Sequence, residues 1–508
     1  MNALEMLPAN IMIGLETAFS LSNLFYCFIG VFLGTLIGVI PGIGALAAIS
    51  MLFPLTLYLD PTAALVMLAG IYYGTSYGGS TASILLNVPG TPSGAVATLD
   101  GYPMTKQGRG GIALSTTTIA SFIGGSIGII LMMLLSPLIV EFALRFGSPE
   151  YFSLMLLGLI AASSISTGSM LTGIAMVAFG ICLGLVGTDI SSGVQRFTFG
   201  AFGLLDGVSL VALAMGLFGV TEVISAIRSS QKQAKEGERV AKVTLRSMIP
   251  TRDDVRRSWM PMFRGTALGS FFGTLPGTGA IIASFMAYAV EKKVSKTPEE
   301  FGQGAIEGVV APEAANNAAD QTAFIPTLTL GIPGSASMAI MLGVLMIHGI
   351  APGPMLLSSH PDIFWGLVMS FWIGNVMLVV LNLPLIGIWV RLVAVPFSVL
   401  YPAIVMFVAI GVYSVNNSIF DVWMVIAIGA LGYLMRVLNL PPAPLLLGYV
   451  LGPLMEEHFR RAMMFSRGDF MTFVNRPISG TILALTVLIL VYGAWSGIKG
   501  KKNRIAPV

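Results

Sequence analysis

The chain contains few charged residues. Asp, Glu, Lys and Arg make up only 10% of its 508 residues, whereas a soluble domain carries about 25%. Hydrophobic residues account for 55%, and the mean hydropathy is +0.86. This composition excludes an ordinary soluble domain and predicts a polytopic membrane protein embedded in a lipid bilayer. The net charge of +3 gives no indication of a nucleic-acid partner.

Residues for several kinds of chemistry are also scarce. The two cysteines, Cys27 and Cys182, lie inside apolar runs, so neither a disulfide framework nor a metal site is expected. The histidines His348, His360 and His458 form no pair at metal-ligand spacing, and we expect structural or interfacial roles for them. The sequence has neither the G-x-x-x-x-G-K-S/T motif of a P-loop nor a G-x-S-x-G motif. We therefore predict that the chain is not an enzyme and has no catalytic residue.

Long charge-free runs occupy most of the chain. A membrane-spanning helix needs roughly 20 residues, so the longest runs hold two spans, or a span and a re-entrant hairpin, and we predict about twelve spans in total. The runs cover residues 17–59, 61–99, 110–140, 151–188, 265–290, 321–361, 363–390, 392–420 and 477–498.

Two apolar segments repeat the same pattern. Residues 34–50 (GTLIGVIPGIGALAAIS) and 269–285 (GSFFGTLPGTGAIIASF) align without gaps, and both carry a P-G-x-G break at mid-length. The break exposes backbone polar groups that lipid cannot satisfy, so it is tolerated only against protein or a polar cavity. The similar segments NVPGTPS (87–93) and GIPGSAS (331–337) follow in the same order. One broken segment in each half of the chain points to the binding site of a transporter.

The distribution of charge predicts how the two halves are arranged. Nine Lys or Arg against four acids lie between Arg228 and Arg257, as is typical of a cytoplasmic loop. The segment Tyr102–Gly110 carries Lys and Arg but no acid, whereas His348–Asp362 carries no Lys or Arg. The positive-inside rule puts these two equivalent segments on opposite sides of the membrane. We therefore predict an all-α protein of two inverted repeats, with broken helices and re-entrant Pro-Gly hairpins.

These expectations divide the chain into five parts. The parts are an N-terminal interfacial segment (1–20), a first membrane repeat (21–227), a basic cytoplasmic loop (228–262), a second membrane repeat (263–498) and a basic C-terminal tail (499–508). The beginning of the chain carries Glu5 and Glu16 but no basic residue, so the N-terminus is expected outside the cytoplasm. The basic tail favours a cytoplasmic C-terminus, but arginines also flank the other side of the last span, so that side is left open.

The first candidate site is a hydroxyl-rich and glycine-rich cluster. Residues 73–81 (YGTSYGGST) run on to 87–94 (NVPGTPSG). Free backbone N–H groups, helix N-termini and hydroxyls bind anions, and unwound backbone carbonyls bind a coupling cation. The alternative is that the small residues only let helices pack closely.

The second candidate site is the segment 311–322 (APEAANNAADQT), followed by 331–337 (GIPGSAS). Glu313 and Asp320 are candidate cation partners or proton carriers, because acids at membrane depth are functional by default. The alternative is that both acids lie in a solvated loop before the span. From the two clusters we predict substrate binding by Ser80, Asn87, Gly90, Thr91, Asn316, Asn317, Gly334 and Ser335. The predicted ion-coupling residues are Gly42, Gly277, Thr278 and Asp320.

The absence of Lys and Arg from both clusters is informative. We expect the two Pro-Gly tips (87–93 and 331–337) to meet near the midplane and to bind an anion through backbone N–H groups, hydroxyls and amides. Without a basic partner, a buried anion needs a co-bound cation to offset its charge. The pattern therefore favours cation symport.

At these residues the sequence resembles a known family, the TctA family of large membrane subunits of tripartite tricarboxylate transporters. The similarity lies in GTLIGVIPGIG, YYGTSYGGSTASILLNVPGTPSGAVATLDGYPM, GTLPGTGAIIASFMAYAVEKK, GVVAPEAANNAADQTAFIPTLTLGIPGSASMAIMLGVLMIHGIAPGP and NLPLIGIWVRL. The segment PEAANNA followed by TLGIPGS is highly specific, whereas a lone P-G-x-G is not. The matching segments extend over nearly the whole chain.

The resemblance implies a multi-pass permease of the bacterial inner membrane that is driven by a gradient of Na⁺ or H⁺. It also implies a small TctB-like membrane subunit and a TctC-like periplasmic solute-binding protein as partners. Family substrates are carboxylates such as citrate, other di- and tricarboxylates and some aromatic acids. The tip after Asn87 is Thr-Pro-Ser in this chain, so citrate itself is not assured. The alternatives are a permease for a neutral or zwitterionic solute, or a polytopic membrane enzyme.

Overall fold

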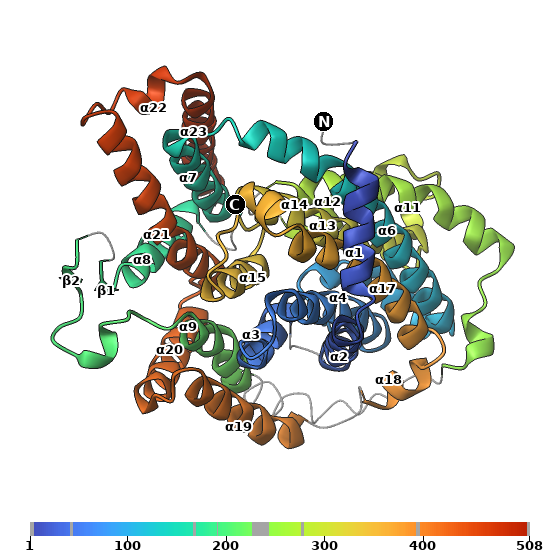
Figure 1. The fold of residues 1–508 in the computed structure, drawn as a ribbon. Coiled ribbons are helices and arrows are strands. Elements are labelled where there is room, and N and C mark those ends of the chain that lie inside the picture. The colour runs from blue at the N-terminus through green and yellow to red at the C-terminus, as the bar shows by residue number, and fades with distance from the viewer. Residues whose placement is uncertain are drawn as a thin grey trace.

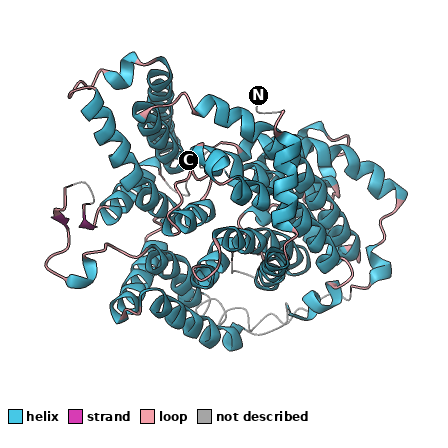
Figure 2. Ribbon diagram, in the orientation of Figure 1, coloured by secondary structure: helices cyan, strands magenta, loops and turns pink. Residues whose placement is uncertain are grey.

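Helices make up nearly all of the regular structure (Figure 2). The computed structural model describes residues 5–40, 44–165, 169–189, 192–225, 243–275, 279–392 and 397–504. Within these ranges the one sheet is an antiparallel pair of two-residue strands, β1 (Gly187–Thr188) and β2 (Gln195–Arg196). The structure thus agrees with the expected all-α membrane protein.

The first half of the chain contains α-helices and two short 3-10 helices in the described residues. They are α1 (Leu7–Ala18), α2 (Leu21–Gly38), α3 (Ala45–Thr56), α4 (Pro61–Leu86), η1 (Ser93–Ala95), α5 (Ala97–Lys106), α6 (Gly110–Ala143), α7 (Ser148–Ile165), α8 (Met170–Gly184), η2 (Phe202–Leu204) and α9 (Leu210–Ala214). Helix α9 continues into a π-helical segment, η3 (Met215–Val220).

The second half contains the remaining helices. They are η4 (Leu245–Met248), α11 (Arg252–Gly273), α12 (Gly279–Val294), η5 (Pro298–Glu300), α13 (Glu307–Thr322), α14 (Phe324–Leu330), α15 (Ala336–Ile347), α16 (Met355–Ser359), α17 (Pro361–Asn382), α18 (Ile386–Leu392), α19 (Phe397–Asn416), α20 (Ile419–Val437), α21 (Pro442–Phe465), α22 (Thr472–Asn475) and α23 (Pro477–Arg504). The predicted basic loop 228–262 is therefore helical from Arg252 onward, and residues 226–242 lie outside the described ranges.

Four of the described helices are long and apolar enough to cross a membrane by themselves. These are α2, α6, α17 and α20. Shorter apolar helices cover Ala45–Thr56, Met170–Gly184, Leu210–Ser225, Ala336–Ile347 and Pro477–Gly493. The expected total of about twelve spans stays a prediction, because only four of the described helices meet the criteria of length and hydropathy by themselves.

One helix ends before each P-G-x-G break and another begins after it. Helix α2 ends at Gly38 and α3 begins at Ala45, and likewise α11 ends at Gly273 and α12 begins at Gly279. The predicted ion-coupling residues Gly42, Gly277 and Thr278 fall in the breaks themselves and lie outside the described residues.

The two halves use the same glycine pattern to pack two helices closely. Helix α2 lies along α4, and Gly30, Gly34 and Gly38 face the backbone at Met67, Ile71 and Thr75. Helix α11 lies along α13, and Gly265, Gly269 and Gly273, each 235 positions later, face the backbone at Ala311, Ala315 and Ala319. An added Cβ on Gly38 would lie 2.5 Å from the Thr75 carbonyl oxygen, and one on Gly273 would lie 2.6 Å from the Ala319 carbonyl oxygen. Small residues let helix backbones approach in this way in membranes.

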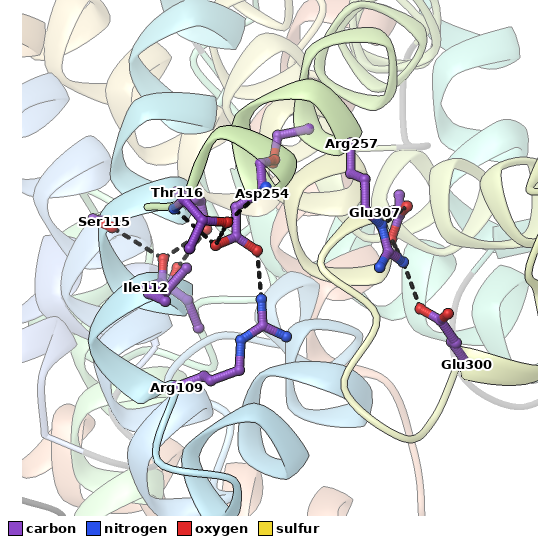
Figure 3. Close-up of polar contacts among 11 residues, drawn as sticks. Arg109, Ile112, Ser115, Thr116, Asp254, Arg257, Glu300 and Glu307 are labelled. Carbon is purple, nitrogen blue, oxygen red and sulfur yellow. Dashed lines mark hydrogen bonds and ion pairs between the residues drawn. The ribbon is translucent and has the colours of Figure 1, made fainter. Parts of the chain in front are cut away.

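A cluster of ion pairs joins the two halves at one end of the helices. Arg109, which precedes α6, pairs with Asp254 at the beginning of α11 (Figure 3). Arg257 lies between Glu300 and Glu307, and its Nε donates to Glu307 at 2.7 Å (Figure 3). The end of the first Pro-Gly hairpin is thus close to the N-terminal turns of α11 and α13.

Asp100 on α5 strengthens the same connection. One of its carboxylate oxygens accepts hydrogen bonds from the backbone N–H groups of Gly302, Gly304 and Ala305, at 2.8, 2.8 and 2.9 Å. The other oxygen accepts from the Tyr288 hydroxyl at 3.0 Å. Because Asp100 is fully buried, these four donors replace water around its charge.

Candidate functional site

Helix α13 is enclosed on three faces. Its Ala311, Ala315 and Ala319 carbonyls face the glycines of α11, as described above. On a second face Gly124 and Gly128 of α6 lie against the backbone carbonyls of Ala314 and Ala318. The third face carries Glu313, Asn316 and Asp320 at helical spacing i, i+3 and i+7. This polar face points toward α4 of the first half, and we call the contact the α4–α13 seam (Figure 1).

Asp320 occupies one end of the seam. The Tyr72 hydroxyl donates to one carboxylate oxygen at 2.6 Å, and the Ser76 hydroxyl donates to the other at 2.9 Å. Asp320 is only 3% exposed. Both donors come from α4 and lie one helical turn apart. A carboxylate of the second half is thus hydrogen-bonded by hydroxyls of the first half.

Glu313 occupies the other end of the seam. Its carboxylate accepts a hydrogen bond from the Ser80 hydroxyl at 3.0 Å. Asn317 donates to the Ser121 hydroxyl of α6 at 2.8 Å and to the Glu313 carbonyl at 3.0 Å. Between the two acids lies Asn316, which is 1% exposed and whose amide oxygen and nitrogen have no hydrogen-bond partner.

The two acids are therefore buried, and the alternative of a solvated loop is wrong for both. Glu313 is 1% exposed, and both acids lie within α13 rather than in a loop before it. The helices α4, α6, α13 and α17 around them contain no Lys, Arg or His. A buried carboxylate without a basic partner must carry a proton or share a cation, because the cost of an isolated charge at low dielectric is prohibitive.

Close packing accounts for one face of α4, and another face makes polar contacts. Gly74 and Gly78 lie against the backbone of α2 and so act in packing. Ser76 and Ser80 point away from α2 and donate to the acids of the seam. The same short segment therefore supplies both a packing surface and a set of polar ligands.

The two Pro-Gly tips fold back on their own helices in the same way. After α4 the chain reverses, and Gly90 lies against Gly79, eleven residues earlier. After α14 the chain reverses again, and Gly334 lies against Ala323, also eleven residues earlier. The first tip is thus next to Ser80 and the Glu313 end of the seam. The second tip follows Asp320 closely, and the Ser335 hydroxyl lies beside Tyr72.

Each tip lies beside one end of the seam, and the expectation that the two tips meet near the midplane stays a prediction. Asn87 ends α4 in the left-handed region (φ 58°), where asparagine is tolerated, and its side chain is exposed. The Thr91 hydroxyl accepts from the Gly94 N–H at 3.2 Å. Neither Gly90 nor Gly334 has a positive φ, so conformational freedom is not the reason for glycine at these two positions.

Two helix N-termini converge at the second tip. Ser335 caps α15 by accepting from the Met338 N–H at 3.3 Å. Gly279, the first residue of α12, has φ 55° and lies near the Gly334 carbonyl oxygen. The first N–H groups of a helix have no partner within the helix, and its N-terminus carries roughly half a positive charge. This end of the seam can accordingly bind an anion without Lys or Arg.

Sequence reasoning missed several of the polar residues around the seam. Tyr72 and Ser76 were not among the predicted site residues, nor was Ser121. Asn375 on α17 also belongs here, because it accepts from the Tyr77 hydroxyl at 2.8 Å and donates to Ser126 at 3.1 Å. A single asparagine within the apolar run FWIGNVMLV was the available signal, since polar residues at membrane depth are rarely without a role.

Comparison with known families agrees with this geometry. The family model of the tripartite tricarboxylate transporter TctA family matches residues 24–447. The chain belongs to the TctA family. The match covers both broken segments, both tips and the whole seam, so the chain is a membrane-integral component of a transporter, and the family is one of transporters rather than of enzymes.

Two relatives of this TctA protein come from Agrobacterium vitis. An uncharacterized 52.8 kDa protein in the TAR-I ttuC' 3' region is 48% identical over 499 residues, which is 98% of both chains. An uncharacterized protein in the TAR-II ttuC' 3' region is 53% identical over 237 residues, covering 47% of this chain and 98% of the relative. No solved structure matches the chain.

Proposed function

We propose that the chain is the large permease subunit of a binding-protein-dependent secondary transporter that imports carboxylates by cation symport. The substrates would be tricarboxylates, dicarboxylates or similar organic acids. The observation that carries the proposal is the α4–α13 seam. It joins two buried acids without a basic partner to a tip at which two helix N-termini converge.

The chemistry of the seam favours an anion and a cation together. A substrate carboxylate fits the N–H groups at the beginning of α12 and α15, together with the Ser335 hydroxyl. Its negative charge adds to those of Glu313 and Asp320, which the surrounding helices do not balance. Co-binding of Na⁺ or H⁺ at the seam removes this imbalance, so that the anion and the cation bind cooperatively.

The proposed partners are a small membrane subunit and a periplasmic solute-binding protein that delivers the substrate. The proposed location is the bacterial inner membrane, with the N-terminus in the periplasm. Contacts at the two ends of α4 support the prediction that Tyr102–Gly110 and His348–Asp362 lie on opposite sides of the membrane. Thr105 donates to the Ile84 carbonyl at 2.8 Å, whereas Gly366 lies beside Thr62. Helix α4 has 26 residues, a length of about 39 Å, which exceeds the hydrocarbon thickness of a bilayer.

Reconstitution tests the proposal directly. The permease, the small subunit and the binding protein are purified, and the two membrane subunits are incorporated into proteoliposomes. Uptake of radiolabelled di- and tricarboxylates is then measured under an imposed Na⁺ or H⁺ gradient, with and without ATP. We expect uptake only with all three proteins and a cation gradient, and no effect of ATP. Robust uptake by the isolated chain, or uptake of neutral solutes alone, would contradict the proposal.

A further inference from the structure

The Glu313 end of the seam has more oxygen ligands than a proton carrier needs. Besides its carboxylate and the Ser80 hydroxyl, it contains the Asn316 amide oxygen, which is buried and has no partner. Asn316 lies one helical turn after Glu313 and on the same face of α13, so its side chain is directed into the same space. A carboxylate that only binds and releases a proton has no use for this amide.

A second hydroxyl reaches the same carboxylate from α6. Ser121 hydrogen-bonds the Glu313 carboxylate and accepts from the Asn317 amide at 2.8 Å. Glu313 thus lies between hydroxyls of two helices, Ser80 on α4 and Ser121 on α6. The Asn316 amide is buried and has no partner, and such a group indicates a ligand because it is costly otherwise.

We propose that Glu313, Ser80, Asn316 and Ser121 form a binding site for Na⁺. The set consists of one carboxylate, two hydroxyls and one amide carbonyl, all of them oxygen donors of the kind that hard cations prefer. One Na⁺ neutralises Glu313 and satisfies the unpartnered Asn316 amide oxygen. The site is separate from Asp320, whose two oxygens already accept from Tyr72 and Ser76. The inference rests on the proposed cation symport and assigns its ion and its ligands.

Equilibrium binding of ²²Na⁺ to the purified full-length chain in lipid nanodiscs tests the site. Glu313→Gln removes the charge and keeps the shape, and Ser121→Ala removes one hydroxyl. We expect Glu313→Gln to weaken Na⁺ binding roughly tenfold or more, and Ser121→Ala to weaken it measurably, because bonds to charged groups are among the strongest polar interactions. Ser115→Ala is the matched control, since the Ser115 hydroxyl donates to the Ile112 carbonyl within α6 at 3.0 Å. It should bind Na⁺ like the wild type.

Several outcomes would overturn the site. These are wild-type Na⁺ binding in Glu313→Gln, no saturable Na⁺ binding to the wild-type chain, or loss of binding only in Asp320→Asn. Gel filtration and thermal unfolding establish that each variant is folded, and the conservative Ser121→Ala keeps the test valid if Glu313→Gln does not fold. The assay uses neither carboxylate nor partner proteins. If Na⁺ binds as expected but the three-protein system imports no carboxylate, the site stands and the proposed function fails. If carboxylates enter on a proton gradient and Na⁺ does not bind, the reverse holds.

Discussion

The equivalent tip glycines Gly90 and Gly334 should respond differently to the same substitution. In Gly90→Ala the added Cβ would overlap the Cα of Gly79 and lie 2.8 Å from the Gly38 carbonyl oxygen. Both obstacles are backbone atoms, which no side-chain rotation can move. The tip must therefore shift by about 1 Å to restore a carbon–carbon distance of roughly 3.5 Å. In Gly334→Ala the nearest atom is the Ala323 Cβ at 3.3 Å, so a shift of a few tenths of an ångström is enough.

The expected magnitudes follow from these distances. Overpacking in a close-packed interior costs about 1–3 kcal/mol, and Gly90→Ala belongs at the upper end because backbone opposes backbone. We expect this variant to lower the apparent melting temperature of the purified chain and to reduce substrate uptake roughly tenfold or more. Gly334→Ala should keep the wild-type melting temperature and lose less uptake. The measurements are thermal unfolding in detergent and uptake in the reconstituted three-protein system at limiting substrate.

A clear result would refute this reasoning. If Gly90→Ala unfolds and transports like the wild type, the first tip does not lie against Gly79 and Gly38. If Gly334→Ala is the more damaging of the two, close backbone approach is not what selects glycine at the first tip.

Three further predictions concern topology, the seam and the connection between the halves. Single cysteines at Lys296 and Ser358, in a background without native cysteines, should react with a membrane-impermeant thiol reagent from opposite faces; labelling of both from one face would contradict the inverted arrangement. Tyr72→Phe removes a hydrogen bond to the Asp320 carboxylate, worth about 1.5–3 kcal/mol, and should reduce substrate uptake roughly tenfold or more without changing Na⁺ binding at Glu313; unchanged uptake would place Asp320 outside the transport machinery. Asp100→Asn replaces a charged acceptor of three backbone N–H groups and should destabilise the chain by about 2 kcal/mol or more, seen as a lower melting temperature, whereas the exposed Glu141→Gln should have no effect.

Much of the architecture could be predicted from glycine, proline and charge. The breaks between α2 and α3 and between α11 and α12 fall where two P-G-x-G segments interrupt apolar runs. The reversals after α4 and α14 likewise fall at the two Pro-Gly tips. These features are local, because proline and glycine act on the backbone within a few residues. The partners of the seam are not local: helical spacing puts Ser76 and Ser80 on one face of α4, but it does not say which helix that face meets.

The burial of α13 shows why its two acids were hard to place from the sequence. The segment APEAANNAADQT has few large apolar side chains, which is typical of a solvated loop as much as of a buried helix. Yet the small side chains are the reason for the burial, because Ala311 and Ala315 let Gly265 and Gly269 of α11 approach the α13 backbone. The same close packing, with α6 on the second face, leaves one face for Glu313 and Asp320 and excludes water from it. A segment of low hydropathy in a membrane protein is therefore not always exposed to water, because a glycine-lined helix can pack against it and bury it. In this chain the glycines that bury α13 lie in α11 and α6, in other parts of the sequence.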